Sequence, residues 1–129
     1  MSAIRLFTAA ALLLLPVFCC AAELPSANGS DIRAALASGR PTVADFGART
    51  CISCRKMAPI LAELQTELNG KGNVLFTDVW ATPALAQDYR VQMIPTQIFF
   101  DARGKEVKRH MGFMEKTAIL KELKALGMK

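Results

Sequence analysis

The middle of the chain carries apolar residues at helical spacing. Between residues 51 and 68, the recurring apolar positions are Met57, Leu61, Leu64 and Leu68. Intervals of three and four residues predict an amphipathic helix with one buried stripe. Pro59 interrupts this helix and should kink it, because proline removes one backbone donor and crowds the preceding turn.

Shorter apolar runs on both sides of this helix are bounded by turn-forming residues, which is typical of strands. Strands are predicted at 42–46, 74–79, 96–100 and 105–111, and further helices at 31–38, 82–89 and 115–126. Ser30 can cap the first helix. Because helices between strands require crossover connections, the first strands should be parallel, and the last two should form an antiparallel hairpin. This order predicts one domain of the α/β class with a mixed sheet of about four strands.

The first 22 residues have a different pattern. Arg5 is their one charged residue, an apolar run covers residues 9–18, and small residues follow, Cys20 and Ala22 among them. This arrangement predicts a secretory signal peptide over residues 1–22, and the apolar run is short for a membrane span. We place cleavage after Ala22, which leaves an exported domain of residues 23–129.

A lipid anchor on Cys19 or Cys20 is the less favoured alternative, because the residue before the modified cysteine would be Phe18 or Cys19 in place of a small residue such as glycine. Once the signal is removed, two of the four cysteines remain, Cys51 and Cys54. They would lie in a compartment where thiols can be oxidised.

The charge of the chain is mildly positive. It carries 16 basic and 11 acidic residues, and losing Arg5 leaves 15 basic residues and a net charge of +4. These charges are spread along the chain, and no basic cluster is interleaved with aromatic residues. They indicate a solvated surface, and we expect no nucleic acid as a partner.

Cys51 and Cys54 lie three residues apart where the long helix should begin. At a helix N-terminus, unpaired backbone N–H groups and the helix dipole stabilise a thiolate. The pKa of Cys51 should therefore fall below the value of about 8.5 of a free thiol, and the thiolate is the nucleophile of disulfide exchange. Cys54 follows one turn later on the same side, so Cys51 can attack a disulfide and Cys54 can resolve it.

Metal binding and a purely structural role are the alternatives for this pair. A structural zinc needs four ligands, but residues 23–129 contain no third cysteine and one histidine, His110, in a predicted edge strand. A copper carrier could combine the two cysteines with a methionine or with His110. A disulfide closing so small a loop would contribute little stability. We expect no metal.

Asp45 and Pro95 are the other informative residues. Asp45 interrupts an apolar strand run six residues before Cys51. If it is buried, its pKa should be raised, which suits a group that takes the proton of Cys54; an exposed aspartate at the strand end is the alternative. For the Ile94–Pro95 bond, base rates favour the trans form.

These residues together resemble the thioredoxin family. The resemblance covers about residues 31–127 and rests on "ADFGARTCISCRKMAPIL", on "YRVQMIPT", on the hairpin "IFFDARGKEV" and on the closing helix. It implies a thioredoxin-like fold with three α/β/α layers, a nucleophilic Cys51, a resolving Cys54 and Asp45 as the buried proton acceptor. Substrates would be protein disulfides, and no cofactor would be needed because the two thiols carry the electrons.

The resemblance also implies a cis Ile94–Pro95 bond that faces the cysteines. Ile94, Pro95 and Thr96 would then line a groove in which an extended substrate peptide pairs with the backbone. The residues that flank the cysteines complete this expected groove: Thr50, Ile52 and Ser53.

The chain departs from the family pattern around the cysteines. The family's Trp-Cys-Gly-Pro-Cys is Thr-Cys-Ile-Ser-Cys here, Gly47 replaces a second tryptophan, and Phe76 takes the place of a lysine that often lies near the aspartate. Residues 98–120 also resemble exported thioredoxin-like domains that receive electrons from a membrane reductase. This likeness implies a periplasmic carrier, fed by a membrane thiol-electron transporter and serving cytochrome c maturation or disulfide repair.

Four further expectations complete the prediction. The protein should be a monomer that reduces disulfides rather than forming them, although the Ile-Ser dipeptide does not fix this direction. Trp80, after the second strand, should be a partly buried packing residue. Met93, beside Ile94, can line the groove.

Overall fold

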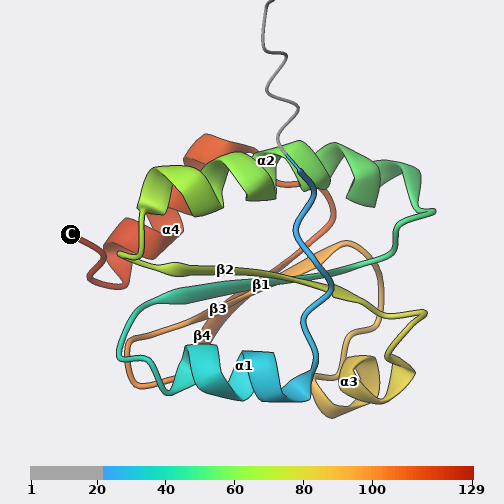
Figure 1. Ribbon diagram of the computed structural model, residues 1–129, viewed down its shortest axis with the longest axis horizontal. Helices are drawn as coiled ribbons and strands as arrows, with labels where there is room; N and C mark the ends of the chain where they lie inside the picture. The colour runs from blue at the N-terminus through green and yellow to red at the C-terminus, as the bar shows by residue number, and fades with distance from the viewer. Residues whose placement is uncertain (1–21) are drawn as a thin grey trace, which may run out of the picture.

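The computed structural model of the protein describes residues 22–129 (Figure 1). Its elements in chain order are α1 (Gly29–Leu36), β1 (Thr42–Gly47), α2 (Ile52–Leu68), β2 (Asn73–Asp78), α3 (Pro83–Asp88), β3 (Thr96–Phe100), β4 (Glu106–Met111) and α4 (Lys116–Ala125). Each predicted element is present within two residues of its expected bounds. Apart from Ala22, the predicted signal peptide lies outside the described residues.

The four strands form one mixed sheet in the order β2-β1-β3-β4. β1 and β2 are parallel, as predicted, and β3 and β4 form the expected antiparallel hairpin. However, β3 runs antiparallel to β1, so the prediction of parallel first strands is wrong for the third strand. The reason is that α3 has six residues and rises only about 9 Å. It cannot carry the chain back along the sheet, and β3 starts at the end where β2 stops (Figure 1).

Helices cover both faces of the sheet, which gives the predicted three layers (Figure 1). On one face, α2 and α4 close a core with residues from β1, β2 and β3: Val43, Met57, Leu61, Leu64, Val74, Phe76, Phe99, Ile119 and Leu123. On the other face, α1 and the α3 segment close a second core: Ile32, Ala44, Phe46, Val79, Ile98 and Phe100. Because side chains alternate along a strand, Asp45 lies on the α2 face, between Ala44 and Phe46 of the opposite face.

The first helix begins earlier than predicted because Asn28, not Ser30, is its cap. The Asn28 side chain accepts hydrogen bonds from the backbone N–H groups of Ser30 and Asp31, at 2.8 and 3.1 Å. In return, the Asp31 carboxylate accepts the Asn28 N–H at 2.8 Å, which completes a capping box. The α2 helix continues through Pro59 to Leu68.

Residues 24–27 lie beside β2 in place of a full N-terminal strand. Ser26 forms a single parallel bridge with Phe76, and Leu24 and Ala27 are buried. Arg49 anchors this segment: its guanidinium donates to the Glu23 carboxylate at 2.7 Å and to the carbonyl oxygen of Leu24. Among the described helices, none combines the length and apolar character needed to cross a bilayer.

Candidate active site

Cys51 is the N-cap of α2. Its backbone is extended, and its Sγ accepts the backbone N–H of Cys54 at 3.3 Å. The Ser53 hydroxyl lies 3.3 Å from the same sulfur. Burial opposes a charge on this thiol, but hydrogen bonds from the side chains and backbone of Cys54 and Ser53 outweigh it and lower the pKa of Cys51. The helix start therefore favours the thiolate at position 51.

Cys54 has the opposite environment. Its side chain is only 3% exposed, whereas Cys51 is half-buried. Burial, together with the hydrogen bond to Cys51 and the nearby charge of Asp45, raises the pKa of Cys54 to about 12. The two thiols are thus unequal: one is accessible and readily ionised, and the other is enclosed and keeps its proton.

Asp45 is fully buried in the middle of β1, so the alternative of an exposed strand-end aspartate is wrong. Burial raises the pKa of Asp45 to about 7, an effect that a hydrogen bond from Gln97 partly offsets. Gln97 Nε2 donates to Asp45 Oδ1 at 2.8 Å from the neighbouring strand β3. A buried carboxyl group with a pKa near neutrality can exchange a proton at physiological pH.

Gly47 is the last residue of β1 and lies against Cys54. A Cβ atom at Gly47 would lie 3.2 Å from Cys54 Cβ and 3.3 Å from Cys54 Sγ. The helix that carries Cys54 therefore packs directly on the strand that carries Asp45. On β2, Phe76 is the register partner of Asp45, which fits the expected replacement of a lysine at this place. The Arg49 guanidinium covers the Phe76 ring at 4.4 Å from its centre.

The Ile94–Pro95 peptide bond is cis. Thr96 pairs with Phe46, so this bond lies at the same end of the sheet as the turn from β1 into α2. Pro95 and Thr96 are buried, and Thr96 Oγ1 donates to the Met93 carbonyl oxygen at 2.7 Å. Of the residues that flank the cysteines, Thr50 and Ile52 are exposed and Ser53 is half-buried.

Trp80 is 68% exposed, so its predicted role as a partly buried packing residue is wrong. It lies in the turn between β2 and α3. Together with Met93 and Ile94, it borders an apolar hollow of about 200 Å³. Ile52, 77% exposed beside Cys51, adds a further apolar side chain to the surface around the dithiol.

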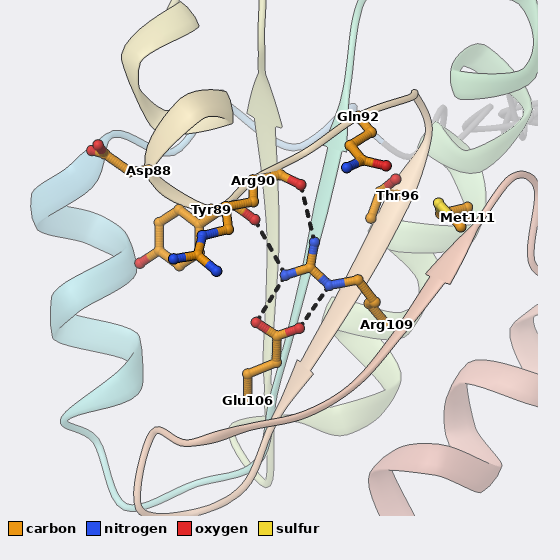
Figure 2. Close-up of a pocket in the computed structure, with 8 residues that line it drawn as sticks. All are labelled: Asp88, Tyr89, Arg90, Gln92, Thr96, Glu106, Arg109 and Met111. Atoms are coloured by element: carbon orange, nitrogen blue, oxygen red, sulfur yellow. Dashed lines mark hydrogen bonds and ion pairs between the residues drawn. The ribbon is translucent and has the colours of Figure 1, made fainter.

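A larger hollow, of about 630 Å³, contains neither cysteine (Figure 2). Its centre is Arg109 of β4, which forms an ion pair with Glu106 at 2.7 Å. Figure 2 shows the same guanidinium donating to the carbonyl oxygens of Tyr89 and Arg90, both at 3.2 Å. Arg109 thus ties β4 to the start of the segment that leads into Ile94–Pro95. Its donors are engaged by the protein itself, which indicates a structural clamp.

No group of three or more histidine, cysteine or acidic side chains that could hold a metal ion occurs within residues 22–129. His110, the histidine considered above as a ligand, lies on β4, with Nε2 3.1 Å from the Phe113 carbonyl oxygen.

Comparisons with known proteins agree with this fold. The family model described as "Thioredoxin-like domain" matches residues 29–127. The thioredoxin of Mycolicibacterium smegmatis is 41% identical over 90 residues, which cover 68% of this chain and 80% of that protein. A bifunctional thioredoxin reductase/thioredoxin of Mycobacterium leprae is 38% identical over 88 residues, and there the chain spans only 19% of the relative's length.

Solved structures show the same fold. A mutant thioredoxin from Halobacterium salinarum superimposes with a TM-score of 0.73 at 24% identity, covering 82% of this chain and 90% of that one. Chloroplastic thioredoxin z gives a TM-score of 0.70 at 26% identity, covering 81% of this chain and 95% of that one.

A four-stranded mixed sheet between helices, with a dithiol at a helix start, defines a thiol–disulfide oxidoreductase. The family model covers most of the described residues and the relatives named above are thioredoxins, so the chain belongs to the thioredoxin family. The predicted family and fold class are confirmed.

Gln97 is the residue of this site that sequence reasoning missed. It lies two positions after Pro95 in an apolar strand run, where a polar side chain interrupts the pattern as Asp45 does in β1. Two such interruptions on strands that pair in register were the available signal, but the register of β1 and β3 is a property of the tertiary structure.

Proposed function

We propose that this protein is an exported thiol–disulfide oxidoreductase that reduces protein disulfides through a Cys51–Cys54 dithiol–disulfide cycle. The observation that carries the proposal is the inequality of the two thiols. Cys51 caps α2, is accessible and has a lowered pKa, whereas Cys54 is enclosed and has a raised one. Attack and resolution therefore fall to different sulfurs in a fixed order.

In the first step, the Cys51 thiolate attacks one sulfur of the substrate disulfide. A bond forms between Cys51 Sγ and that sulfur, and the other substrate sulfur leaves as a thiolate that takes a proton from solvent. The Cys54 N–H bond to Cys51 Sγ, at 3.3 Å, orients the nucleophile and stabilises its charge before attack.

In the second step, the buried Cys54 thiol passes its proton to the Asp45 carboxylate and attacks Cys51 Sγ. The Cys51–Cys54 disulfide forms, and the second substrate sulfur leaves as a thiolate. Two electrons have moved from the protein dithiol to the substrate, and no further cofactor takes part. The protonated Asp45 then releases its proton. A pKa of about 7 suits this role, since the group is partly ionised at neutral pH and can both accept and return the proton.

The substrate groove in this proposal lies between the dithiol and the Ile94–Pro95–Thr96 segment. An extended peptide would pair with the backbone before Pro95 while its disulfide reaches Cys51. Thr50, Ile52 and Ser53 border the attacking sulfur. The exposed Trp80 and Met93 side chains extend the groove with apolar surface. Substrates that carry an apolar side chain near the disulfide should therefore bind best.

Reduction is the proposed direction because the named relatives are thioredoxins, one of them joined to a thioredoxin reductase. Export rests on the pattern of residues 1–22, and a periplasmic monomer receiving electrons from a membrane thiol-electron transporter is part of the proposal. Reduction and oxidation of substrates require different reduction potentials of the Cys51–Cys54 pair. Equilibration with glutathione separates them, because a reductase gives a strongly reducing potential and an oxidase an oxidising one.

Two cysteine variants test the assigned roles. Cys54→Ser should accumulate mixed disulfides on Cys51 when it is mixed with insulin whose disulfides are intact, because the resolving thiol is absent. Cys51→Ser should lose turnover and capture nothing. If Cys51→Ser captured substrate, the two roles would be reversed. If Cys54→Ser kept full turnover, Cys54 would not be the resolving thiol. For export, the N-terminal residue of the protein recovered from a periplasmic fraction should be Glu23.

A further inference from the structure

Asp45 and Gln97 form an isolated polar pair inside the core. They are register partners on β1 and β3, both are fully buried, and Gln97 Nε2 donates to Asp45 Oδ1 at 2.8 Å. Each residue has one further oxygen, Asp45 Oδ2 and Gln97 Oε1, that is buried without a hydrogen-bond partner. Both oxygens are acceptors, so a proton on Asp45 could join them directly.

The pair therefore has different hydrogen bonds in its two protonation states. When Asp45 is ionised, the Gln97 N–H is its donor, and a hydrogen bond to a charged group is about twice as strong as a neutral one. When Asp45 carries a proton, its O–H can donate to Gln97 Oε1 while the N–H bond persists. An amide can serve both states because it holds a donor and an acceptor on one planar group.

The other groups packed around Asp45 come from α2, β2 and α4. From α2, the ionisable group that couples to Asp45 is Cys54. From β2, the register partner is the apolar Phe76, and α4 contributes the apolar Ile119 and Leu123 to this face. Within residues 22–129, Gln97 is the only side chain that hydrogen-bonds to the Asp45 carboxyl group.

We propose that Gln97 is a positioning residue for proton transfer, which partners Asp45 in both protonation states so that the carboxyl group can take the proton of Cys54 and return it. This inference rests on the proposed function, because it assigns Gln97 to the resolving step. The proton moves from Cys54 Sγ to the Asp45 carboxylate, and Gln97 neither gains nor loses one. In place of a charged lysine near the aspartate, this chain would use a neutral amide.

Removing the amide should make Asp45 harder to ionise. Gln97→Met keeps the length of the side chain but has neither the donor nor the acceptor. A buried carboxylate left without a donor is destabilised more than a buried neutral acid left without a partner, and the Gln97 hydrogen bond lowers the pKa of Asp45 in the wild type, so this pKa should rise by about one unit in Gln97→Met. The resolving step can be measured in a single turnover as the release of the second substrate thiol. Its half-maximal rate should then occur at a correspondingly higher pH.

The experiment measures the Asp45 carboxyl ¹³C shift against pH in the reduced protein, for the wild type and Gln97→Met, with Gln97→Leu as a second variant if the first does not fold. Asp45→Asn combined with Gln97→Met is the control. It has no carboxyl group at this place, so Gln97→Met should no longer shift the pH midpoint of resolution. A purely structural role of Gln97 would instead slow resolution equally at all pH values.

An unchanged Asp45 titration in Gln97→Met overturns the inference, and so does a pH shift that persists in the Asp45→Asn background. The carboxyl titration requires no turnover, so it tests Gln97 even if the protein does not reduce disulfides. Conversely, the wild type could reduce insulin while Asp45 titrates identically in the wild type and in Gln97→Met. The proposed function would then stand, and the role of Gln97 would be excluded.

Discussion

Gly47 lies directly against Cys54, because a Cβ atom placed on Gly47 would come within 3.2 Å of Cys54 Cβ and of the Phe76 ring. These distances are shorter than ordinary contacts, and both neighbours are buried. The absence of a side chain at position 47 thus sets how closely the start of α2 packs on β1, and with it the enclosure of Cys54.

Gly47→Ala should therefore displace Cys54 by a few tenths of an ångström and reduce stability by about 1–3 kcal/mol, the usual range for an overpacked core. Urea unfolding of the reduced protein measures the free energy, and alkylation of Cys54 reports its enclosure. Gly29→Ala, in the first turn of α1, is the control and should have little effect, because a Cβ atom there meets only the ends of the flexible Arg33 and Leu85 side chains. An unaltered unfolding midpoint for Gly47→Ala would show that the site adapts without strain.

Asp45 should make the protein less stable as the pH rises. Its pKa is about 7 in the folded state and 3.8 as its ordinary value, so between these values the folded state binds the proton and the unfolded state does not. Stability from this group is present in full below pH 3.8, falls between pH 3.8 and 7, and is lost above pH 7. The difference of about three pH units between the two pKa values corresponds to an upper limit of about 4 kcal/mol.

Asp45→Asn imitates the neutral acid at every pH. It should therefore match the wild type in stability at about pH 4 and exceed it at about pH 8, by up to about 4 kcal/mol. Chemical unfolding of the reduced proteins across this range measures the difference. If the two stability curves run parallel with pH, Asp45 does not carry the raised pKa in solution.

The Ser53 hydroxyl should help to ionise Cys51. It lies 3.3 Å from Cys51 Sγ, and its hydrogen bond is among the effects that lower the pKa of this thiol. Ser53→Ala should raise the Cys51 pKa, because it removes one of the hydrogen bonds that stabilise the thiolate, and the effect should be small because this sulfur is partly exposed to solvent. The iodoacetamide reaction rate against pH gives the value. Ile52→Ala, which removes no polar contact of this sulfur, serves as the control and should leave the rate profile in place.

Trp80 should contribute to binding of protein substrates and little to stability, because it is 68% exposed beside the apolar hollow near Ile94. Exposed aromatic anchors often dominate an interface. Trp80→Ala should raise KM for a protein disulfide about tenfold, equivalent to about 1.4 kcal/mol. The rate with a small aromatic disulfide should stay the same. Val107→Ala, exposed on β4, is a matched control. Equal losses with both kinds of substrate would place Trp80 in the fold instead of the groove.

Arg109 should hold the segment that leads to the cis peptide bond, since it donates to the carbonyl oxygens of Tyr89 and Arg90 (Figure 2). Arg109→Met should lower stability by about 1–2 kcal/mol through the lost carbonyl bonds, with little from the partly exposed ion pair. It should also speed amide hydrogen exchange in residues 91–93. Arg103→Met, which loses only an exposed pair with Asp101, should alter neither quantity.

Much of the fold follows from local sequence patterns. The apolar stripe of α2 and the turn-bounded apolar runs of the strands were sufficient to place every element within two residues, because both patterns depend on repeat lengths set by the backbone. The direction of β3 did not follow. The length of α3 was predicted within two residues, but the path by which the chain returns from α3 to the sheet depends on the tertiary structure.

The candidate site divides in the same way. The position of Cys51 at a helix start is local, and the sequence by itself determined it. Asp45 could be suspected, but its burial, its pairing with Gln97 and the exposure of Trp80 depend on which strands and helices meet. The Asp45–Gln97 contact joins residues 52 positions apart, and no local pattern encodes it. The sequence alone thus determined the reactive dithiol and its helix, whereas only the tertiary structure decided how its proton is handled, because desolvation and hydrogen bonding act through neighbours in space.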